Sequence, residues 1–184
     1  MAKAIRVVHY LNQFFAGIGG DEKADVGPSA MEGPVGPGRL LQQLLGDEGE
    51  VVATVVCGDN YISEMPGFTE EHKHKALEVL RETLEQHSGD VVVAGPAFID
   101  GRYGIGCGEM CRASWSAGVP AVTGMHPENV ATPLYVEDVY IVPTGDSPAE
   151  MGAVMKKLAY LVLKLGKDGK LGSPEEDGYI SPDG

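Results

Sequence analysis

The chain has 184 residues, of which 43 % are hydrophobic and 22 % are charged, so it is long enough to build one well-buried core. Its net charge of −13 argues against nucleic-acid binding, which needs a basic face. No run of 18 apolar residues occurs, so we expect no membrane-spanning helix. Three cysteines without a disulfide-like framework, and an opening that leads straight into a strand rather than a signal peptide, predict a cytoplasmic protein.

Short runs rich in Val and Ile recur along the chain and predict strands. They are continuous rather than alternating, which is typical of strands covered on both faces in a parallel sheet. The five expected strands are residues 5–11, 50–57, 90–94, 120–123 and 138–142.

Helical patterns separate most of these strands, at residues 38–45, 69–87, 108–117 and 147–166. The last opens with Ser147-Pro148-Ala-Glu150, which fits an N-cap, a proline at the first helical position and the acid of a capping box. Alternation of strands and helices predicts an α/β fold with helices on both faces of an open, parallel five-stranded sheet. In this three-layer, flavodoxin-like or Rossmann-like class, five strands favour the flavodoxin-like order.

Two segments do not fit the alternation. Residues 12–37 are far longer than a usual strand-to-helix loop, and at the carboxyl edge of a sheet a functional loop is favoured over a floppy insertion. After Gly166 the chain turns polar and rich in Gly and Pro. We therefore expect residues 1–166 to form the domain and residues 167–184 to form a linker or tail that is not tied to the core.

In open α/β sheets the site lies beyond the carboxyl ends of the strands. Five segments reach that edge, namely residues 9–13, 57–61, 95–98, 125–128 and 144–146. They carry acids, amides, thiols and histidine, which supports a polar pocket. His126 is the best acid–base candidate there, although it fits an ordinary loop residue equally well, whereas His9 inside a strand is expected to be a hydrogen-bonded core histidine.

A glycine-rich segment stands just ahead of the helix expected at 108–117. There the N–H groups around Gly104, Gly106 and Gly108 could converge on an anion, with Arg102 as a clamp for a carboxylate. A tight strand-to-helix turn explains the glycines equally well. The segment is neither a dinucleotide fingerprint nor a phosphate-binding loop of the Walker type, so nucleotide binding is unsupported.

Cys107 falls at the expected start of that helix, where the helix dipole favours the thiolate, and a packing role is equally open. Cys111 follows one turn later and is expected in the core. As a pair, the two could form a disulfide, bind a metal with outside ligands, or pack. Cys57 ends a strand and could face the same cleft.

Several motifs follow one another in order between about residue 5 and residue 180. They are IRVVHYLNQFFAGIGG at 5–20, EKAD at 22–25, VGPG at 35–38, VCGD at 56–59, AGPAF at 94–98, GRYG at 101–104, VTGM at 122–125, GSP at 172–174 and GYI at 178–180. Together with Cys107 and Cys111, they resemble the selenoprotein B subunit family of the glycine, sarcosine and betaine reductases.

The resemblance implies a hetero-oligomeric complex that cleaves a C–N bond reductively. In that family a pyruvoyl-bearing partner subunit holds the amine substrate, and a carboxymethyl group passes to selenoprotein A. The selenocysteine lies in the second half of the B subunit, within a Cys-x-x-Sec motif. This sequence holds neither that motif nor a Cys-x-x-Cys. It is therefore expected to carry no cofactor of its own and to be inactive alone, as a truncated protein or as a separate subunit.

The resemblance also selects site residues, namely Asn12, Gln13, Cys57, Asp59, Arg102 and Cys107, without assigning their individual roles. The residue patterns above add Gly104, Gly106 and His126. The expected substrate-binding set is therefore Asn12, Gln13, Asp59, Arg102, Gly104, Gly106 and His126, and Cys57 and Cys107 are the expected catalytic residues. Three hypotheses follow: a reductase domain that helps to build the amine site, a docking module that uses its long loop, and a stand-alone enzyme with a thiol pair. The sequence does not choose among glycine, sarcosine and betaine.

Overall fold

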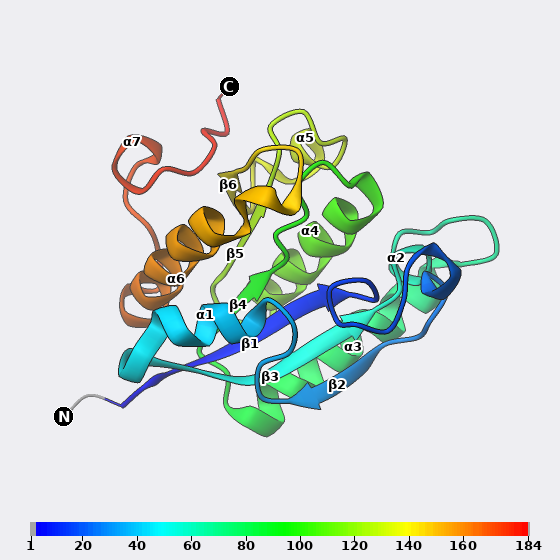
Figure 1. Ribbon diagram of the computed structural model, residues 1–184, viewed down its shortest axis with the longest axis horizontal. Coiled ribbons are helices and arrows are strands. Elements are labelled where there is room, and N and C mark those ends of the chain that lie inside the picture. Colours follow the sequence, from blue (N-terminus) through cyan, green and yellow to red (C-terminus); the bar gives the residue numbers. More distant parts are fainter. Residues whose placement is uncertain (1–2, 184) are drawn as a thin grey trace.

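The computed structural model describes residues 3–183 and shows a mostly parallel sheet between two layers of helices (Figure 1). The six strands are β1 (Ile5–Asn12), β2 (Ser29–Glu32), β3 (Gly49–Cys57), β4 (Val91–Ala94), β5 (Ala121–Met125) and β6 (Tyr140–Pro143). Their order is β2-β3-β1-β4-β5-β6, and only the β2–β3 pair is antiparallel. The predicted α/β class is confirmed, with one strand more than expected.

Helices cover both faces of the sheet. They are α1 (Gly38–Leu45), α2 (Asp59–Ile62), α3 (Glu70–His87), α4 (Gly101–Ser116), α5 (Thr132–Tyr135), α6 (Met151–Asp168) and α7 (Pro174–Asp177). One apolar core lies between the sheet and the helices α1 and α6, and a second lies between the sheet and α3 and α4 (Figure 1). Both faces are thus buried, which explains why the strands read as continuous apolar runs.

The five parallel strands follow the flavodoxin-like order that the sequence favours. From β1 the chain moves outward to β3 and then crosses back to β4 on the other side of β1. The loops that leave β1 and β4 therefore run in opposite directions. Such a switch point opens a crevice at the carboxyl ends of the two strands.

The additional strand lies inside the long segment after β1. Residues 29–32 pair with residues 53–56 of β3, and the Thr54 hydroxyl donates a hydrogen bond to the Gly33 carbonyl oxygen at 2.8 Å. Its sequence, Ser-Ala-Met-Glu, carries no continuous apolar run because this edge strand is largely exposed. The pairing holds the segment in place at the sheet edge.

Helix α4 differs from its prediction, because it begins at Gly101 rather than at Gly108. Asp100 is the N-cap, and its carboxylate accepts a hydrogen bond from the Tyr103 N–H at 3.2 Å. Three glycines that read as a helix-breaking turn therefore lie inside the helix. The close approach of neighbouring side chains requires them, since β-carbons at Gly104 and Gly106 would come within 3.0 Å of Asn129 and of the Tyr10 hydroxyl.

The polar segment after α6 also differs from its prediction. Leu171 is buried in the core, and Asp177 pairs with Lys164 of α6 at 2.8 Å. The Ile180 N–H donates a hydrogen bond to the Ile141 carbonyl oxygen of β6 at 2.8 Å. Residues 171–180 are thus tied to the domain, which the composition of the segment did not indicate.

Candidate functional site

A polar cavity of about 260 Å³ opens at the switch point between β1 and β4. Asn12 and Gln13 reach it from the end of β1, Asp59 from the start of α2 after β3, and Asp100 from the N-cap of α4. The remaining lining residues are Phe14, Phe15, Gly20, Asp21 and Pro148. The fold thereby brings together three of the predicted site residues, Asn12, Gln13 and Asp59, from separate segments of the chain.

Asp59 is the centre of this cavity's hydrogen bonds. Its Oδ2 accepts from Asn12 Nδ2 at 3.1 Å and from Gln13 Nε2 at 3.4 Å. The Gln13 Oε1 in turn accepts from the Asp59 backbone N–H at 3.0 Å. Asn12 is fixed in the same way, because its Oδ1 accepts from the Phe15 N–H at 2.9 Å. The two amide side chains are therefore held in one orientation by the backbone and point their N–H groups at one carboxylate oxygen.

The other oxygen of Asp59, Oδ1, is buried and has no hydrogen-bond partner among residues 3–183. The residue as a whole is only 1 % exposed. The pKa of Asp59 is raised to about 6, because burial and the nearby negative charge of Asp100 raise it by more than Asn12, Arg102 and Gln13 lower it. A carboxylate in such surroundings is typical of a functional site rather than of a packing position.

Two tyrosine hydroxyls, like Asp59 Oδ1, are buried polar atoms without a hydrogen-bond partner in the described part of the chain. The hydroxyls of Tyr10 and Tyr103 are buried without partners, so neither forms a hydrogen bond with Asp59. Their rings meet edge to face with centroids 6.1 Å apart, and Tyr103 also stacks on Phe15. Burial raises the pKa of both hydroxyls well above the usual value, with smaller contributions from nearby thiols and from Asp59. Both therefore stay protonated as hydrogen-bond donors.

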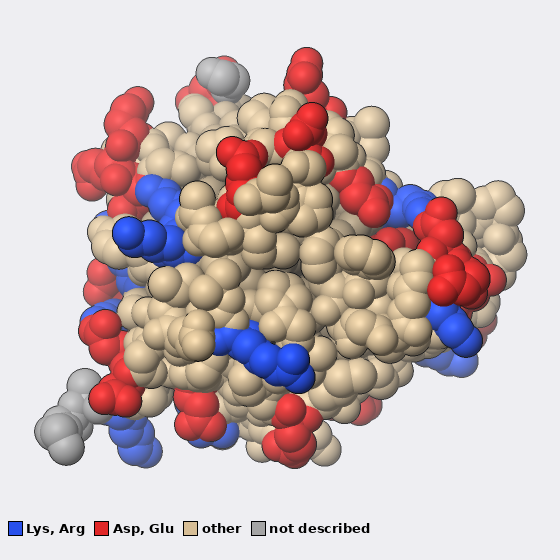
Figure 2. Space-filling model, in the orientation of Figure 1, with Lys and Arg blue, Asp and Glu red and all other residues tan. Residues whose placement is uncertain are grey.

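Arg102 pairs with Asp21, a residue that lines the cavity, and does not form part of an anion cradle. Its Nη1 donates to the Asn60 side-chain oxygen at 2.6 Å, and its Nη2 pairs with Asp21 at 2.7 Å. The guanidinium thus joins α4 to the loop that follows β1, a region where Figure 2 shows acidic and basic side chains meeting at the right of the view. Asn60, Asp21 and Asp100 were absent from the sequence-based set. The signal for Asp100 was its place one residue ahead of the glycine-rich helix.

The predicted anion cradle at Gly104, Gly106 and Gly108 does not form. These residues lie within α4, and the Gly104 N–H donates to the Asp100 carbonyl oxygen at 2.8 Å, as in any helix interior. Their N–H groups belong to the backbone ladder and are not free to converge on an anion. The explanation that these glycines permit a tight strand-to-helix turn is also wrong, because the turn ends before Gly101 and the three glycines lie inside the helix.

All three cysteines are unpaired and buried. Cys107 lies in the second turn of α4 and not at the helix start, and of the two roles that the sequence left open for it, its full burial favours packing. Burial raises the pKa of Cys57 to about 12 and raises the pKa values of Cys107 and Cys111 above their usual range. The core position predicted for Cys111 is confirmed. Nothing in these surroundings activates a thiol as a nucleophile.

We expect all three thiols to resist alkylation in the folded chain, because each is buried and protonated at neutral pH. Limiting iodoacetamide at pH 7 to 8, followed by peptide mass spectrometry, should label none of them until denaturant is added. Rapid labelling of Cys107 in the native chain, ahead of Cys57 and Cys111, would contradict this and restore a reactive role for that residue.

The two strand-associated histidines take different places. His126 follows β5, its Nδ1 accepts from the Glu128 N–H at 2.9 Å, and it does not line the cavity. His9 is buried with its Nε2 hydrogen-bonded to the Gly95 carbonyl oxygen at 2.8 Å, which confirms the prediction of a core histidine. Burial lowers the pKa of His9 to about 4, so it is neutral. Because His126 does not line the cavity, it lies outside the site that contains Asp59.

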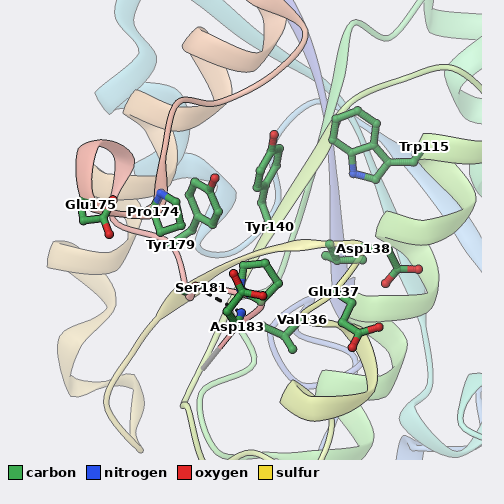
Figure 3. A pocket seen from close by; sticks show the side chains of 12 residues that line it. Trp115, Val136, Glu137, Asp138, Tyr140, Pro174, Glu175, Tyr179, Ser181 and Asp183 are labelled. Atoms are coloured by element: carbon green, nitrogen blue, oxygen red, sulfur yellow. Dashed lines mark hydrogen bonds between the residues drawn. The ribbon is translucent and has the colours of Figure 1, made fainter.

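A larger cavity, of about 530 Å³, lies between the segment that leads into β6 and the carboxyl-terminal segment (Figure 3). Trp115, Tyr140 and Tyr179 line it, and their rings pack edge to face in a row. Its carboxylates come from residues that are exposed at its rim, such as Glu137 and Glu175. Among residues 3–183, the buried side-chain atom without a partner that belongs to its lining residues is the uncharged Trp115 Nε1. The smaller cavity at the switch point is therefore the better candidate site.

No helix within residues 3–183 is long and apolar enough to cross a membrane. Over the same residues, no group of three or more His, Cys, Asp or Glu side chains is arranged to hold a metal ion.

Comparison with known proteins identifies the family. A family model described as glycine/sarcosine/betaine reductase selenoprotein B matches residues 4–183. The chain is 48 % identical over 98 % of its length to a glycine reductase complex component B subunit gamma of Carboxydothermus hydrogenoformans. It is 46 % identical over 96 % of its length to a sarcosine reductase complex component B subunit beta of Peptoclostridium acidaminophilum. A betaine reductase complex component B subunit beta of the same organism is 35 % identical over 95 % of the chain.

The matches cover nearly all of this chain but only part of each relative. The chain spans 40 % of the first of these relatives, 39 % of the second and 38 % of the third. No solved structure matches it. Because the family model extends from the first strand to the carboxyl-terminal segment, the resemblance seen in the sequence motifs is confirmed. The chain belongs to the glycine/sarcosine/betaine reductase selenoprotein B family.

Proposed function

We propose that this chain supplies part of the amine-binding site of a reductase B component that cleaves a C–N bond reductively in the cytoplasm. The observation that carries the proposal is the buried Asp59 carboxylate, oriented by Asn12 and Gln13 at the switch-point cavity. An acidic cavity suits the ammonium group of an amine. A pyruvoyl-bearing subunit and selenoprotein A are the partners that this proposal requires, with the selenocysteine outside this chain.

The chain has no reactive thiol of its own in this arrangement, which disfavours a stand-alone thiol enzyme. Under the proposal it positions the amine, while the pyruvoyl group and the selenocysteine supply the bond-breaking chemistry. Asn12 and Gln13 hold the Asp59 carboxylate, and Asp59 binds and orients the ammonium group. The cavity's burial excludes bulk water from that charge pair and so strengthens it.

The proposal predicts a binding defect in an assembled B component that carries this sequence. We expect Asp59→Asn to raise KM for the amine about tenfold or more with a smaller change in kcat, because it removes one charge-assisted interaction. The matched control is His74→Ala on the exposed side of α3, which should leave KM unchanged. The isolated chain should show no turnover with a dithiol donor. Unchanged KM in Asp59→Asn would overturn the proposal.

A specific observation favours a second candidate, a docking module. Phe14 is 58 % exposed and Ile18 is 37 % exposed, and both lie on the long loop after β1. Exposed large apolar side chains on an ordered loop are typical of a protein interface. If docking is the whole role, Phe14→Ser should weaken assembly of the component as measured by analytical ultracentrifugation, and Asp59→Asn should change neither assembly nor KM.

A further inference from the structure

We infer that the larger cavity, which Trp115, Tyr140 and Tyr179 line, is a second binding site that takes a small organic cation of the quaternary ammonium type. We call it the aromatic cavity. Its volume of about 530 Å³ falls in the range of small-molecule sites. It shares no lining residue with the switch-point cavity, so the inference goes beyond the proposed function and does not depend on it.

Three aromatic rings form one side of the aromatic cavity. Tyr140 lies between Trp115 and Tyr179 (Figure 3), with ring centroids 5.9 Å from Trp115 and 4.8 Å from Tyr179. The planes of neighbouring rings are inclined at 67° and 68°. Rings inclined so steeply present carbon surface in different directions, as the walls of an aromatic cage do.

The polar atoms of these rings are engaged elsewhere or buried. The Tyr140 hydroxyl accepts a hydrogen bond from the Leu171 N–H at 3.2 Å, and the Tyr179 hydroxyl donates one to the Gly172 carbonyl oxygen at 2.7 Å. Neither Leu171 nor Gly172 lines the cavity. The Nε1 atom of Trp115 is buried, so the exposed part of the indole is carbon. A ligand that reaches the rings therefore meets mainly aromatic carbon.

The charge of the lining residues sets the sign of the ligand. Among residues 3–183, no Lys, Arg or His lines the cavity, whereas Glu137, Asp138, Glu175 and Asp183 do. Asp138 pairs with Arg112 at 2.8 Å. The other three have no ion-pair partner within the same residues. Their exposed carboxylates attract a cation and repel an anion.

Aromatic carbon beside unpaired carboxylates favours one kind of cation. A quaternary ammonium group spreads its charge over methyl groups, is attracted by ring faces and needs no hydrogen bonds. A primary ammonium group would lose hydrogen bonds to water against rings that offer few acceptors. A zwitterion would bring its carboxylate to a rim of the same sign. Glycine, sarcosine and betaine all carry a carboxylate, so this site is distinct from the amine site proposed above.

Fluorescence titration tests the inference, because Trp115 is the only tryptophan of the chain and lines the cavity. The probes are choline, the neutral dimethylbutanol in which carbon replaces the choline nitrogen, and betaine, which has the same trimethylammonium group and a carboxylate. We expect choline to change the Trp115 emission saturably, with an affinity at least about tenfold higher than that of dimethylbutanol. At low ionic strength it should also exceed the affinity of betaine about threefold or more.

Three variants separate the rings from the rim. Tyr179→Leu removes one ring and should lower the affinity for choline about fivefold. Tyr179→Phe is the matched control, because it keeps the ring and should retain most of the affinity. Glu175→Gln removes one exposed, unpaired carboxylate and should lower the affinity for choline about twofold at low salt, with no effect on dimethylbutanol.

Each alternative outcome has a definite meaning. Equal affinities for choline and dimethylbutanol would show an apolar pocket without preference for charge and would overturn the inference. Betaine binding as tightly as choline would remove the role of the rim, and the absence of any saturable Trp115 response in the folded chain would remove the site. If Tyr179→Leu detaches the carboxyl-terminal segment, the three probes on wild type and on Glu175→Gln still decide. The proposed function is tested separately, through KM in Asp59→Asn.

Discussion

Replacing Gly108 with alanine should destabilise the chain by about 3 kcal/mol, although alanine is the better helix former by about 1 kcal/mol. A β-carbon at this position would overlap the ring of Tyr135. That ring cannot easily move, because the Tyr135 hydroxyl donates to Glu109 Oε2 at 2.6 Å and the Arg112 guanidinium lies 4.5 Å from the ring centroid. Urea unfolding followed by circular dichroism measures the effect.

The chain offers a matched control for this substitution. Gly152 is also helical, in the first turn of α6, but a β-carbon there would meet nothing within 4 Å. Gly152→Ala should therefore leave stability unchanged or raise it by up to about 1 kcal/mol. If Gly108→Ala were as harmless as Gly152→Ala, the glycine-rich segment could not be packed inside α4 against Tyr135, and a loop role for it would return.

This contrast also explains why the sequence misplaced the start of α4. Glycines at 104, 106 and 108 read as a loop because glycine is intrinsically poor in helices. Here they are selected by tertiary contacts, since the helix packs closely against Tyr10, Asn129 and Tyr135. A single sequence does not reveal those contacts. The error then affected Cys107, which was expected at a helix terminus and for which an activated thiol was therefore held as open as a packing role.

Other parts of the fold could be predicted because local pattern and global arrangement agree. The parallel strands are Val-rich and buried on both faces, so their runs are plain in the sequence. Strand β2 was missed because it is short, exposed and antiparallel at an edge. The carboxyl-terminal segment was misjudged because its attachment depends on a few specific contacts, such as Asp177 with Lys164, and not on its composition.

The candidate site was predictable in position and less so in detail. The rule that parallel strands place functional groups at their carboxyl ends located Asn12, Gln13 and Asp59, which the structure brings to one cavity. It also selected His126, which the structure places away from that cavity. The partnership of Arg102 with Asp21 and Asn60 spans 81 and 42 residues of sequence and carries no local signal.

Asp59→Asn should make the chain more stable at neutral pH, and the gain should vanish in acid. The pKa of Asp59 is about 6 in the folded chain against an ordinary 3.8, so the folded state binds this proton more tightly than the unfolded state. The group therefore favours folding below about pH 4, and that contribution is lost as the pH rises through 6. The difference of about two pKa units corresponds to about 3 kcal/mol at pH 7.5.

Urea unfolding of wild type and of Asp59→Asn at several pH values between 4 and 7.5 measures this effect. The quantity of interest is the change with pH in the difference between their free energies of unfolding. Any fixed cost of placing an amide NH₂ group where Oδ1 stands cancels in that comparison. Asp177→Asn is the control of opposite sign, because hydrogen bonding to Lys164 lowers the pKa of Asp177. The ion pair of Asp177 with Lys164 stabilises the fold at pH values above the ordinary pKa of an aspartate, and this stabilisation is lost in acid. Asp177→Asn should therefore be less stable than wild type at neutral pH, and its stability should converge on that of wild type as the pH falls.

A stabilising Asp59→Asn substitution would link the fold to the proposed site. A buried carboxylate that costs the chain free energy at working pH has no structural reason to be there, since an amide of the same shape serves the packing. The charge is then explained by a ligand that neutralises it, and the proposed function supplies such a ligand in the ammonium group of an amine. If instead the variant were less stable than wild type by the same amount at every pH, the carboxylate would be a structural hydrogen-bond acceptor for Asn12 and Gln13, and the proposed site would lose its main physical argument.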